Sequence, residues 1–351
     1  MTRERALLLF AGGIVGLLAI CLVALGNPPN MGFCIACFLR DTAGGLGLHR
    51  AAAAQYIRPE ILGLALGSFG VAVATREFRP AGGASSLTRF LLGFLVMLGM
   101  LVFLGCPLRL VLRLAAGDLN ALIGLAGLVA GVAAGNEFLK RGFSLGRANP
   151  LRQVNGYVFP ALVLAGLVLL LARPAFIFFS QEGPGSMRAP VFVALAAGVA
   201  VGVLAQRARL CMVGGIRDFL LFRDTHLLSG FAAVGVVAFA GSLLTGNFHA
   251  GFANQPIAHN QFLWNFLGMS LAGMGSVLLG GCPLRQLVLA GEGNTDAAVA
   301  ILGMLAGAAT AHNFGLAASP QGVPLAGQVV VITGIMAVML LAWFNREPVR
   351  A

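Results

Sequence analysis

Long apolar runs recur along the chain, separated by short stretches rich in arginine, glycine and proline. Most runs reach about 20 residues, the length at which an α-helix crosses the hydrocarbon core of a bilayer. They lack the alternation over about ten residues that a transmembrane β-barrel requires. The pattern predicts an all-α polytopic membrane protein with ten spans, at about 6–25, 59–75, 87–104, 120–135, 157–172, 190–205, 226–245, 262–280, 297–314 and 325–344.

One polar stretch, residues 27–58, does not resemble an ordinary loop. It is rich in glycine and alanine, contains Cys34-Ile-Ala-Cys37 and ends at Pro59. We interpret it as a broken or re-entrant segment. The first apolar run, which follows two arginines, could also be a signal peptide. A retained span is favoured because this run aligns with residues 190–205 at the spacing of the repeat described next.

Two short motifs occur twice. Gly105-Cys106-Pro107-Leu108-Arg109 returns as Gly281-Cys282-Pro283-Leu284-Arg285, and Cys34 with Arg40-Asp41 returns as Cys211 with Arg217-Asp218. The chain is therefore predicted to consist of two transmembrane repeats, 1–175 and 176–351, with about five spans each. Homologous halves with an odd number of spans must insert in opposite orientations. Inverted repeats of this kind are typical of transporters with a site near the middle of the membrane, and we expect an hourglass-like transport domain.

Composition supports a membrane location. The 351 residues are 58% hydrophobic and 10% charged, whereas soluble domains carry about 25% charged residues. The net charge of +11 comes mostly from arginines in loops that a cytoplasmic N-terminus would place inside. The sequence therefore predicts a bacterial cytoplasmic (inner) membrane protein with both termini in the cytoplasm. Arginines on the outer side are exceptions to this pattern, namely Arg40, Arg50, Arg58, Arg109, Arg113, Arg173 and Arg188.

The Gly-Cys-Pro-Leu-Arg motif has a chemical interpretation. Proline favours the first position of a helix, so Cys106 and Cys282 are expected at helix N-termini, where free N–H groups favour negative charge. Arg109 and Arg285 lie about one turn further on and can face the same point. This arrangement suits a soft anion bearing sulfur or selenium, so these four residues are candidate substrate-binding groups. The alternative is that the prolines only break helices and the cysteines only fill the core.

The second motif gives a mixed prediction. Cys34 and Cys211 are further candidates for substrate contact, whereas Arg40-Asp41 and Arg217-Asp218 are expected to be structural ion pairs. Cys34 and Cys37 form a C-x-x-C pair, a redox signature only in a thioredoxin-like setting. Gly214 replaces Cys37 in the second repeat. No spacing of cysteine or histidine fits a metal site, and no nucleotide-binding motif is present, so neither a metal, a cofactor nor an enzyme activity is predicted.

At these residues the sequence resembles the YeeE/YedE family of membrane transporters for sulfur compounds. The stretch 26–41, Gly-Asn-Pro-Pro-Asn-Met-Gly-Phe-Cys-Ile-Ala-Cys-Phe-Leu-Arg-Asp, is similar to the YedE-like branch linked to selenium transport. The resemblance implies uptake of thiosulfate or a related anion through an hourglass-shaped protein. It also implies that Cys34, Cys106 and Cys282 pass the anion along by S–H hydrogen bonds, with Cys211 as the fourth repeat-related position.

The leading hypothesis is therefore a permease that imports a small selenium- or sulfur-containing anion. Its partners would be that anion, membrane lipid and a soluble sulfur or selenium carrier in the cytoplasm. No residue discriminates selenium from sulfur, or a channel from coupled transport. The first alternative is a membrane thiol oxidoreductase that acts through Cys34-Cys37 and the waist cysteines, meaning those expected at the narrow middle of the hourglass. A non-transporting scaffold subunit is the second.

Overall fold

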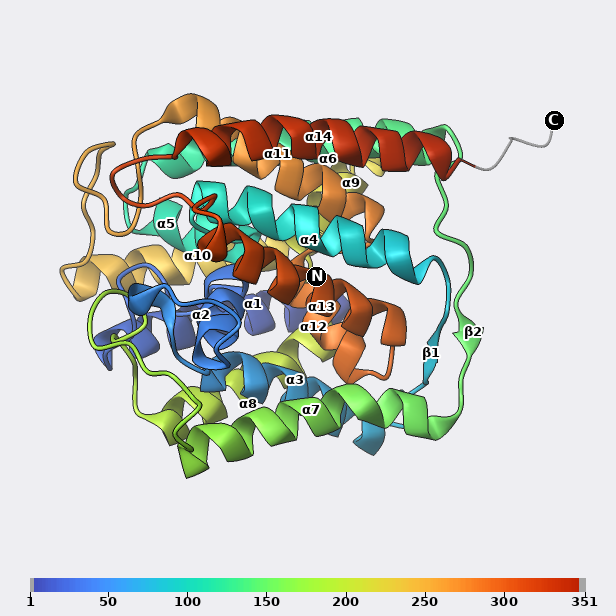
Figure 1. The fold of residues 1–351 in the computed structure, drawn as a ribbon, viewed down its shortest axis with the longest axis horizontal. Coiled ribbons are helices and arrows are strands. Elements are labelled where there is room, and N and C mark those ends of the chain that lie inside the picture. Colours follow the sequence, from blue (N-terminus) through green and yellow to red (C-terminus); the bar gives the residue numbers. More distant parts are fainter. Residues whose placement is uncertain (1–2, 347–351) are drawn as a thin grey trace.

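The computed structural model describes residues 3–346, which fold almost entirely into α-helices (Figure 1). The first half contains α1 (Arg3–Ala24), α2 (Ile35–Gly45), α3 (Pro59–Ala74), α4 (Ser86–Phe103), α5 (Pro107–Ala115), α6 (Asn120–Lys140) and α7 (Gln153–Ala172). The second half contains α8 (Val191–Ala208), α9 (Met212–Phe222), α10 (His226–Leu244), α11 (Phe262–Leu278), α12 (Pro283–Gly291), α13 (Thr295–Asn313) and α14 (Leu325–Phe344). Two strands, β1 (Ala81–Gly82) and β2 (Asn149–Pro150), pair antiparallel, and a 3₁₀ turn covers Ala52–Ala54.

Ten segments of the described residues are long and apolar enough to cross a membrane, as the apolar runs predict. Their bounds lie close to the predicted ones. The main difference is that α6 continues to Lys140, five residues beyond the apolar run, because its last turns carry polar residues past the apolar stretch. The all-α polytopic architecture is confirmed.

Four short helices, α2, α5, α9 and α12, interrupt this arrangement. The helix α2 is buried along its whole length and occupies part of the stretch predicted to be broken or re-entrant. The helices α5 and α12 follow α4 and α11 after a sharp turn, and each begins at the proline of the repeated motif. The chain thus contains one short helix after each repeated cysteine.

Helices of the first half pack against helices of the second half. The helix α1 packs on α10 and α3 packs on α8, while α4 packs on α13 and α6 packs on α11. The backbones approach closely at these crossings: a Cβ added to Gly12 would lie 2.0 Å from the carbonyl oxygen of Gly230. Small residues permit such approach between membrane helices. One continuous apolar core results, and it draws on both halves of the chain.

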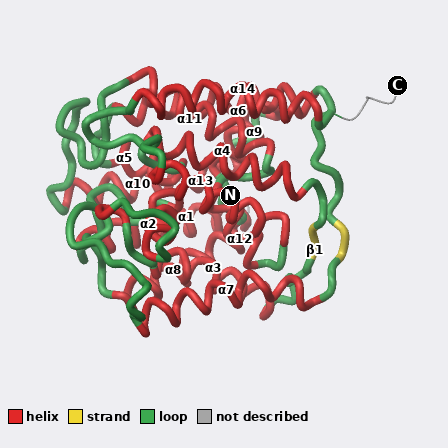
Figure 2. The backbone as a smooth tube through the Cα atoms, viewed as in Figure 1, coloured by secondary structure: helices red, strands yellow, loops and turns green. Residues whose placement is uncertain are grey.

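The two ends of the helix bundle differ. Long loops gather at one end, which we call the loop end, whereas β1 and β2 lie at the opposite end, the strand end (Figure 2). The helix α7 starts near β2 and runs toward the loop end, and α14 runs from the loop end back toward the C-terminus (Figure 1). These two helices, the last of each half, therefore run in opposite directions.

Candidate functional site

Each of the four repeated cysteines is the residue that precedes a short helix. Cys34 caps α2 and accepts a hydrogen bond from the Cys37 N–H at 3.3 Å, and Cys211 caps α9 and accepts one from the Gly214 N–H at 3.2 Å. Cys106 and Cys282 have extended backbone and stand directly before the prolines of α5 and α12. The structure therefore places all four thiols at helix N-termini.

These cysteines meet in two pairs. Cys34 and Cys106 lie close enough for their thiols to interact, and the backbone N–H groups of Ala36 and Arg109 lie near Cys106. In the second half, Cys211 Sγ lies 3.8 Å from Cys282 Sγ and accepts from the Cys282 N–H at 3.4 Å. Each pair thus joins the N-termini of two short helices, where backbone donors concentrate.

The two pairs lie near each other in the core. The helix α2 contacts α12 and α5 contacts α9, so each short helix of one half touches one of the other half. Cys106 also lies within electrostatic range of Cys282. All four side chains are at most 5% exposed. None of them lies on the outer surface of the protein.

Cys37, which sequence reasoning set apart from the repeated design, lies inside this cluster. Its Sγ is 2.8 Å from Cys34 Sγ, both thiols being free, and 3.7 Å from Nη1 of Arg109. Its place in α9 is taken by Gly214. The first half therefore contributes three thiols to the cluster and the second half two.

Arg109 is completely buried and holds three segments together. Its guanidinium donates to Oδ1 of Asn30 at 2.8 and 3.2 Å, to the Ile257 carbonyl at 3.3 Å and to the Leu104 carbonyl. Asn30, Leu104 and Ile257 all adopt left-handed backbone conformations, with φ of 49°, 62° and 50°. Such conformations are unusual for residues other than glycine and are retained where the surrounding contacts enforce them. No carboxylate of the described residues pairs with Arg109.

Arg285, the counterpart of Arg109, has a different environment. It remains partly exposed and lies 3.5 Å from Glu292. Burial raises the pKa of the Glu292 carboxyl above its usual value, against the opposing effect of the Arg285 charge. The motif predicted equivalent roles for the two arginines, but their charge balance in the structure differs.

The glycine before each cysteine makes room for these arginines. A Cβ on Gly105 would lie 3.1 Å from Cδ of Arg109, and a Cβ on Gly281 would lie 2.9 Å from Cβ of Arg285. The arginine side chain therefore folds back over the turn that carries the thiol. The group that approaches each glycine is the arginine of the same motif.

The two Arg-Asp motifs form ion pairs of 2.6 Å (Arg40–Asp41) and 2.8 Å (Arg217–Asp218). Sequence reasoning missed that Arg58, 17 residues further on, binds the second oxygen of Asp41 at 2.8 Å. The sequence signal that could have identified Arg58 was its predicted position on the outer side, where arginines are exceptions to the positive-inside pattern. It also missed the buried pair Arg113–Asp118 at 2.6 Å.

Two hollows open at opposite ends of the protein. The Arg40 hollow, of about 350 Å³, lies at the loop end and is lined by Arg40, Leu104, Ile257, His312 and small residues of the neighbouring loops. The Arg217 hollow, of about 290 Å³, lies at the strand end and is lined by Arg89, Leu139, Arg217 and Gly280, among others. Repeat-matched positions line both, namely Arg40 with Arg217, Leu104 with Gly280, and Gly315 with Leu139.

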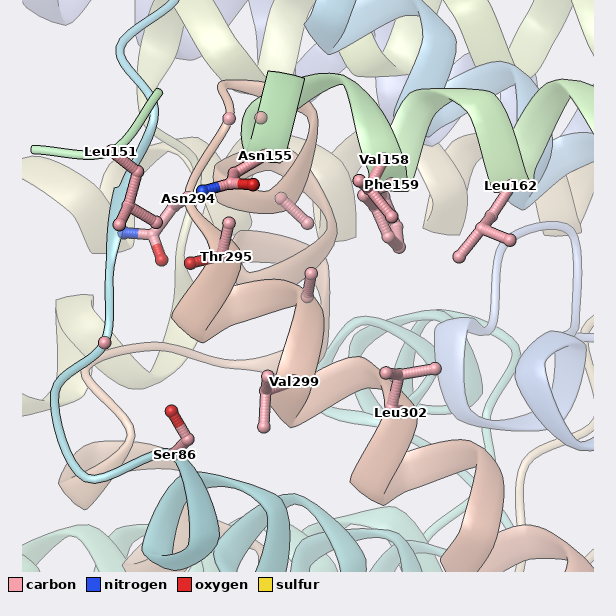
Figure 3. Close-up of a pocket in the computed structure, with 15 residues that line it drawn as sticks. Ser86, Leu151, Asn155, Val158, Phe159, Leu162, Asn294, Thr295, Val299 and Leu302 are labelled. Atoms are coloured by element: carbon pink, nitrogen blue, oxygen red, sulfur yellow. The ribbon is translucent and has the colours of Figure 1, made fainter. Parts of the chain in front are cut away.

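A third pocket, of about 380 Å³, is an apolar groove between α7 and α13 (Figure 3). Val158, Phe159 and Leu162 line one side, and Val299 and Leu302 line the other. No charged side chain lines it, so this groove is not suited to an anion. In the described part of the chain, no group of three His, Cys, Asp or Glu side chains is arranged to hold a metal ion.

Ten apolar helices packed around buried thiols define a multi-pass α-helical membrane protein. Residues 207–345 match the family model described as "Sulphur transport". A thiosulfate transporter, TsuA of Spirochaeta thermophila, is 31% identical over 112 residues. This match covers 32% of the chain and 33% of that relative, so it spans about a third of the relative's length. Both matches bear out the predicted resemblance to YeeE/YedE proteins, and the family match lies in the second half of the chain.

Proposed function

We propose that this protein is a permease that imports a small sulfur- or selenium-containing anion across the bacterial cytoplasmic membrane by a cysteine relay. Its family and relative support a sulfur-anion transporter, and a transporter is not expected to be an enzyme. The observation that carries the proposal is the series of buried polar groups and thiols that lies between the two hollows. A scaffold subunit would not need such a series.

The proposed route begins at the Arg40 hollow. Leu104 and Ile257 line that hollow, and their carbonyls also hold Arg109. Arg109 contacts Cys37, which is adjacent to the pair Cys34–Cys106. The pair Cys211–Cys282 follows, and Gly281 beside it leads to Gly280 in the wall of the Arg217 hollow.

The chemistry of these groups suits an anion. An ion that leaves water must find donors inside the protein, because burial of an unpaired charge is costly. Thiols and the N–H groups at helix N-termini are donors that carry no full charge, so they can hold an anion without trapping it. Hydrogen bonds to a charged acceptor contribute about 1.5–3 kcal/mol each. Successive thiols could therefore pass the anion along in small steps.

The proposal includes two inverted repeats, 1–175 and 176–351. It is supported by the exchanged helix contacts, by the repeat-matched lining of the hollows and by the opposite directions of α7 and α14. Most loop arginines lie near the strand end, which we assign to the cytoplasm together with both termini. A soluble sulfur or selenium carrier would receive the anion there.

The test is uptake of labelled thiosulfate, selenite and selenosulfate into proteoliposomes that contain only this protein. Uptake of at least one anion is expected, and Cys106→Ala and Cys282→Ala should each lower it at least about tenfold while the protein still folds. Cys21→Ala is the matched control, because Cys21 is exposed on α1. Normal uptake by both Cys106→Ala and Cys282→Ala would refute the relay. Uptake by purified protein would exclude the scaffold role.

A second candidate function is a membrane thiol oxidoreductase, favoured by the 2.8 Å approach of Cys34 and Cys37. Two thiols would form a disulfide there by passing two electrons and two protons to a partner disulfide or quinone. A mixed disulfide trapped at Cys37, together with loss of function in Cys37→Ser alone, would support it. The replacement of Cys37 by Gly214 in the other half weighs against it.

A further inference from the structure

We propose that the Arg40 hollow is a capture site for a small oxyanion, with Arg40 and His312 as its donors. The proposal rests on the transport function above and assigns the place where the anion first binds. Arg40 was expected to serve only as a structural ion pair, and no histidine was assigned a role.

Arg40 is only partly used by its ion pair. Its Nε and Nη2 both donate to the same oxygen of Asp41, at 2.9 and 2.6 Å. The remaining nitrogen, Nη1, has no partner among the described residues, and the residue lines the hollow. One face of the guanidinium therefore remains available to a ligand.

His312 supplies the second donor. Its Nε2 is buried and makes no hydrogen bond within residues 3–346, although a buried polar atom normally has a partner. Its ring stacks on His49 at a centroid distance of 4.6 Å, and Nε2 of His49 lies 3.0 Å from the Arg40 carbonyl. His312 is therefore held beside Arg40 with one nitrogen unsatisfied. The tautomer that carries its proton on Nε2 would donate to a bound oxyanion.

The rest of the hollow limits what can bind. Apart from Arg40, His312 and Ser319, the lining residues are apolar or glycine, and most of them are small. The site therefore offers a cation and a neutral donor in an otherwise apolar wall. This combination favours a small anion over a cation or a zwitterion, because no carboxylate lines the hollow.

The charge balance explains why the Arg40 hollow, and not its counterpart, is the capture site. Asp41 is shared by Arg40 and Arg58, so this cluster has one cation more than anions. Arg109 lies behind the wall of the hollow without a carboxylate partner in the described chain. In the second half, Arg217 has Asp218 to itself and Arg285 has Glu292. A positive hollow concentrates anions, whereas a neutralised one releases them.

The capture site can be tested by calorimetric titration of thiosulfate into the purified protein, alongside uptake at increasing concentration. Arg40→Gln and His312→Ala should each weaken binding about tenfold or more. In uptake they should raise the half-saturating concentration and change the maximum rate by less than about twofold. If Arg40→Gln does not fold, His312→Ala and Arg40→Lys decide. His312→Ala leaves the Arg40–Asp41 pair intact, and lysine at position 40 keeps a cation beside Asp41. Arg141→Gln is the control, because Arg141 is exposed and does not line the hollow.

Failure of the capture site and failure of the relay give different results. Cys106→Ala should lose uptake but still bind thiosulfate with wild-type affinity, because Cys106 does not line the hollow. Wild-type affinity in both Arg40 and His312 variants would overturn the capture site and leave the relay standing. Absence of uptake by the unaltered protein, with thiosulfate binding retained, would instead refute the transport function.

Discussion

Cys211 and Cys282 belong to different helices, yet the backbone N–H of Cys282 donates to Cys211 Sγ at 3.4 Å. Their Sγ atoms are 3.8 Å apart. Groups in such contact act as a unit, so their substitutions should not be additive. We expect Cys211→Ala and Cys282→Ala each to lower uptake at least about tenfold, roughly the effect of losing one hydrogen bond to a charged acceptor.

The measurement for this pair is initial uptake rates in a double-mutant cycle. The double variant should be little worse than either single variant. Multiplication of the two single effects would show that the thiols act independently, and would contradict their function as one station of the relay.

Arg109 should resist replacement even by lysine. Arg109→Gln and Arg109→Lys both lose the planar fork that binds Asn30, Leu104 and Ile257 together. Each buried acceptor left without a donor costs about 1–3 kcal/mol, so we expect a loss of several kcal/mol in unfolding free energy and loss of uptake. Thermal unfolding in detergent measures the first effect.

Arg141→Gln is the control for Arg109, because it removes only an exposed ion pair with Glu137. Surface pairs contribute about 0–1 kcal/mol. A melting temperature for Arg109→Lys equal to that of Arg141→Gln would show that charge alone suffices at position 109.

Gly281 should not tolerate a side chain. The Cβ of Gly281→Ala would lie 2.9 Å from Cβ of Arg285 and 3.6 Å from Cys211 Sγ, so the arginine must move. We expect reduced uptake with a moderate loss of stability. Gly70→Ala is the matched control, because nothing lies within 4 Å of its added Cβ and alanine favours α3 by about 0.5–1 kcal/mol. Equal behaviour of the two variants would contradict the proposed packing role of Gly281.

The stability of the protein should depend on pH through Glu292. Burial raises its pKa above the usual 4.5, so the folded protein binds this proton more tightly than the unfolded chain. The stabilisation by Glu292 is then fully present below pH 4.5 and is lost as pH rises through the raised folded-state pKa. Melting temperatures of the wild type and Glu292→Gln against pH measure this effect. If the melting temperature of Glu292→Gln changes with pH as steeply as that of the wild type, the pH dependence comes from another group.

Cys37 separates the two candidate functions. A relay through the repeated cysteines should survive Cys37→Ser with uptake within about threefold of wild type, because serine keeps a donor of similar geometry. An oxidoreductase would lose all activity, because serine cannot form a disulfide. Uptake assays and trapping of mixed disulfides on this one variant distinguish the cases.

Much of the architecture could be predicted because it depends on local chemistry. Apolar runs long enough for a bilayer become spanning helices wherever they occur, and proline after a cysteine starts a helix. The repeated spacing from Cys106 to Cys282 and from Cys34 to Cys211 therefore located the four thiols at helix N-termini. The pairing of Arg40 with Asp41 and of Arg217 with Asp218 was expected because the residues are adjacent.

The partners of these groups could not be predicted from sequence. Arg109 and Arg285 stand in identical motifs, but one binds carbonyls from distant loops and the other binds Glu292. His312 reaches Arg40 only because α2 and α13 pack together, and Arg58 joins Asp41 where the start of α3 packs against α2. Hydropathy and motifs specify helices and their first turns, which depend on neighbouring residues alone. The environment of Arg109 and the hollows also depend on contacts between segments more than 100 residues apart, and these are settled only when the two halves pack.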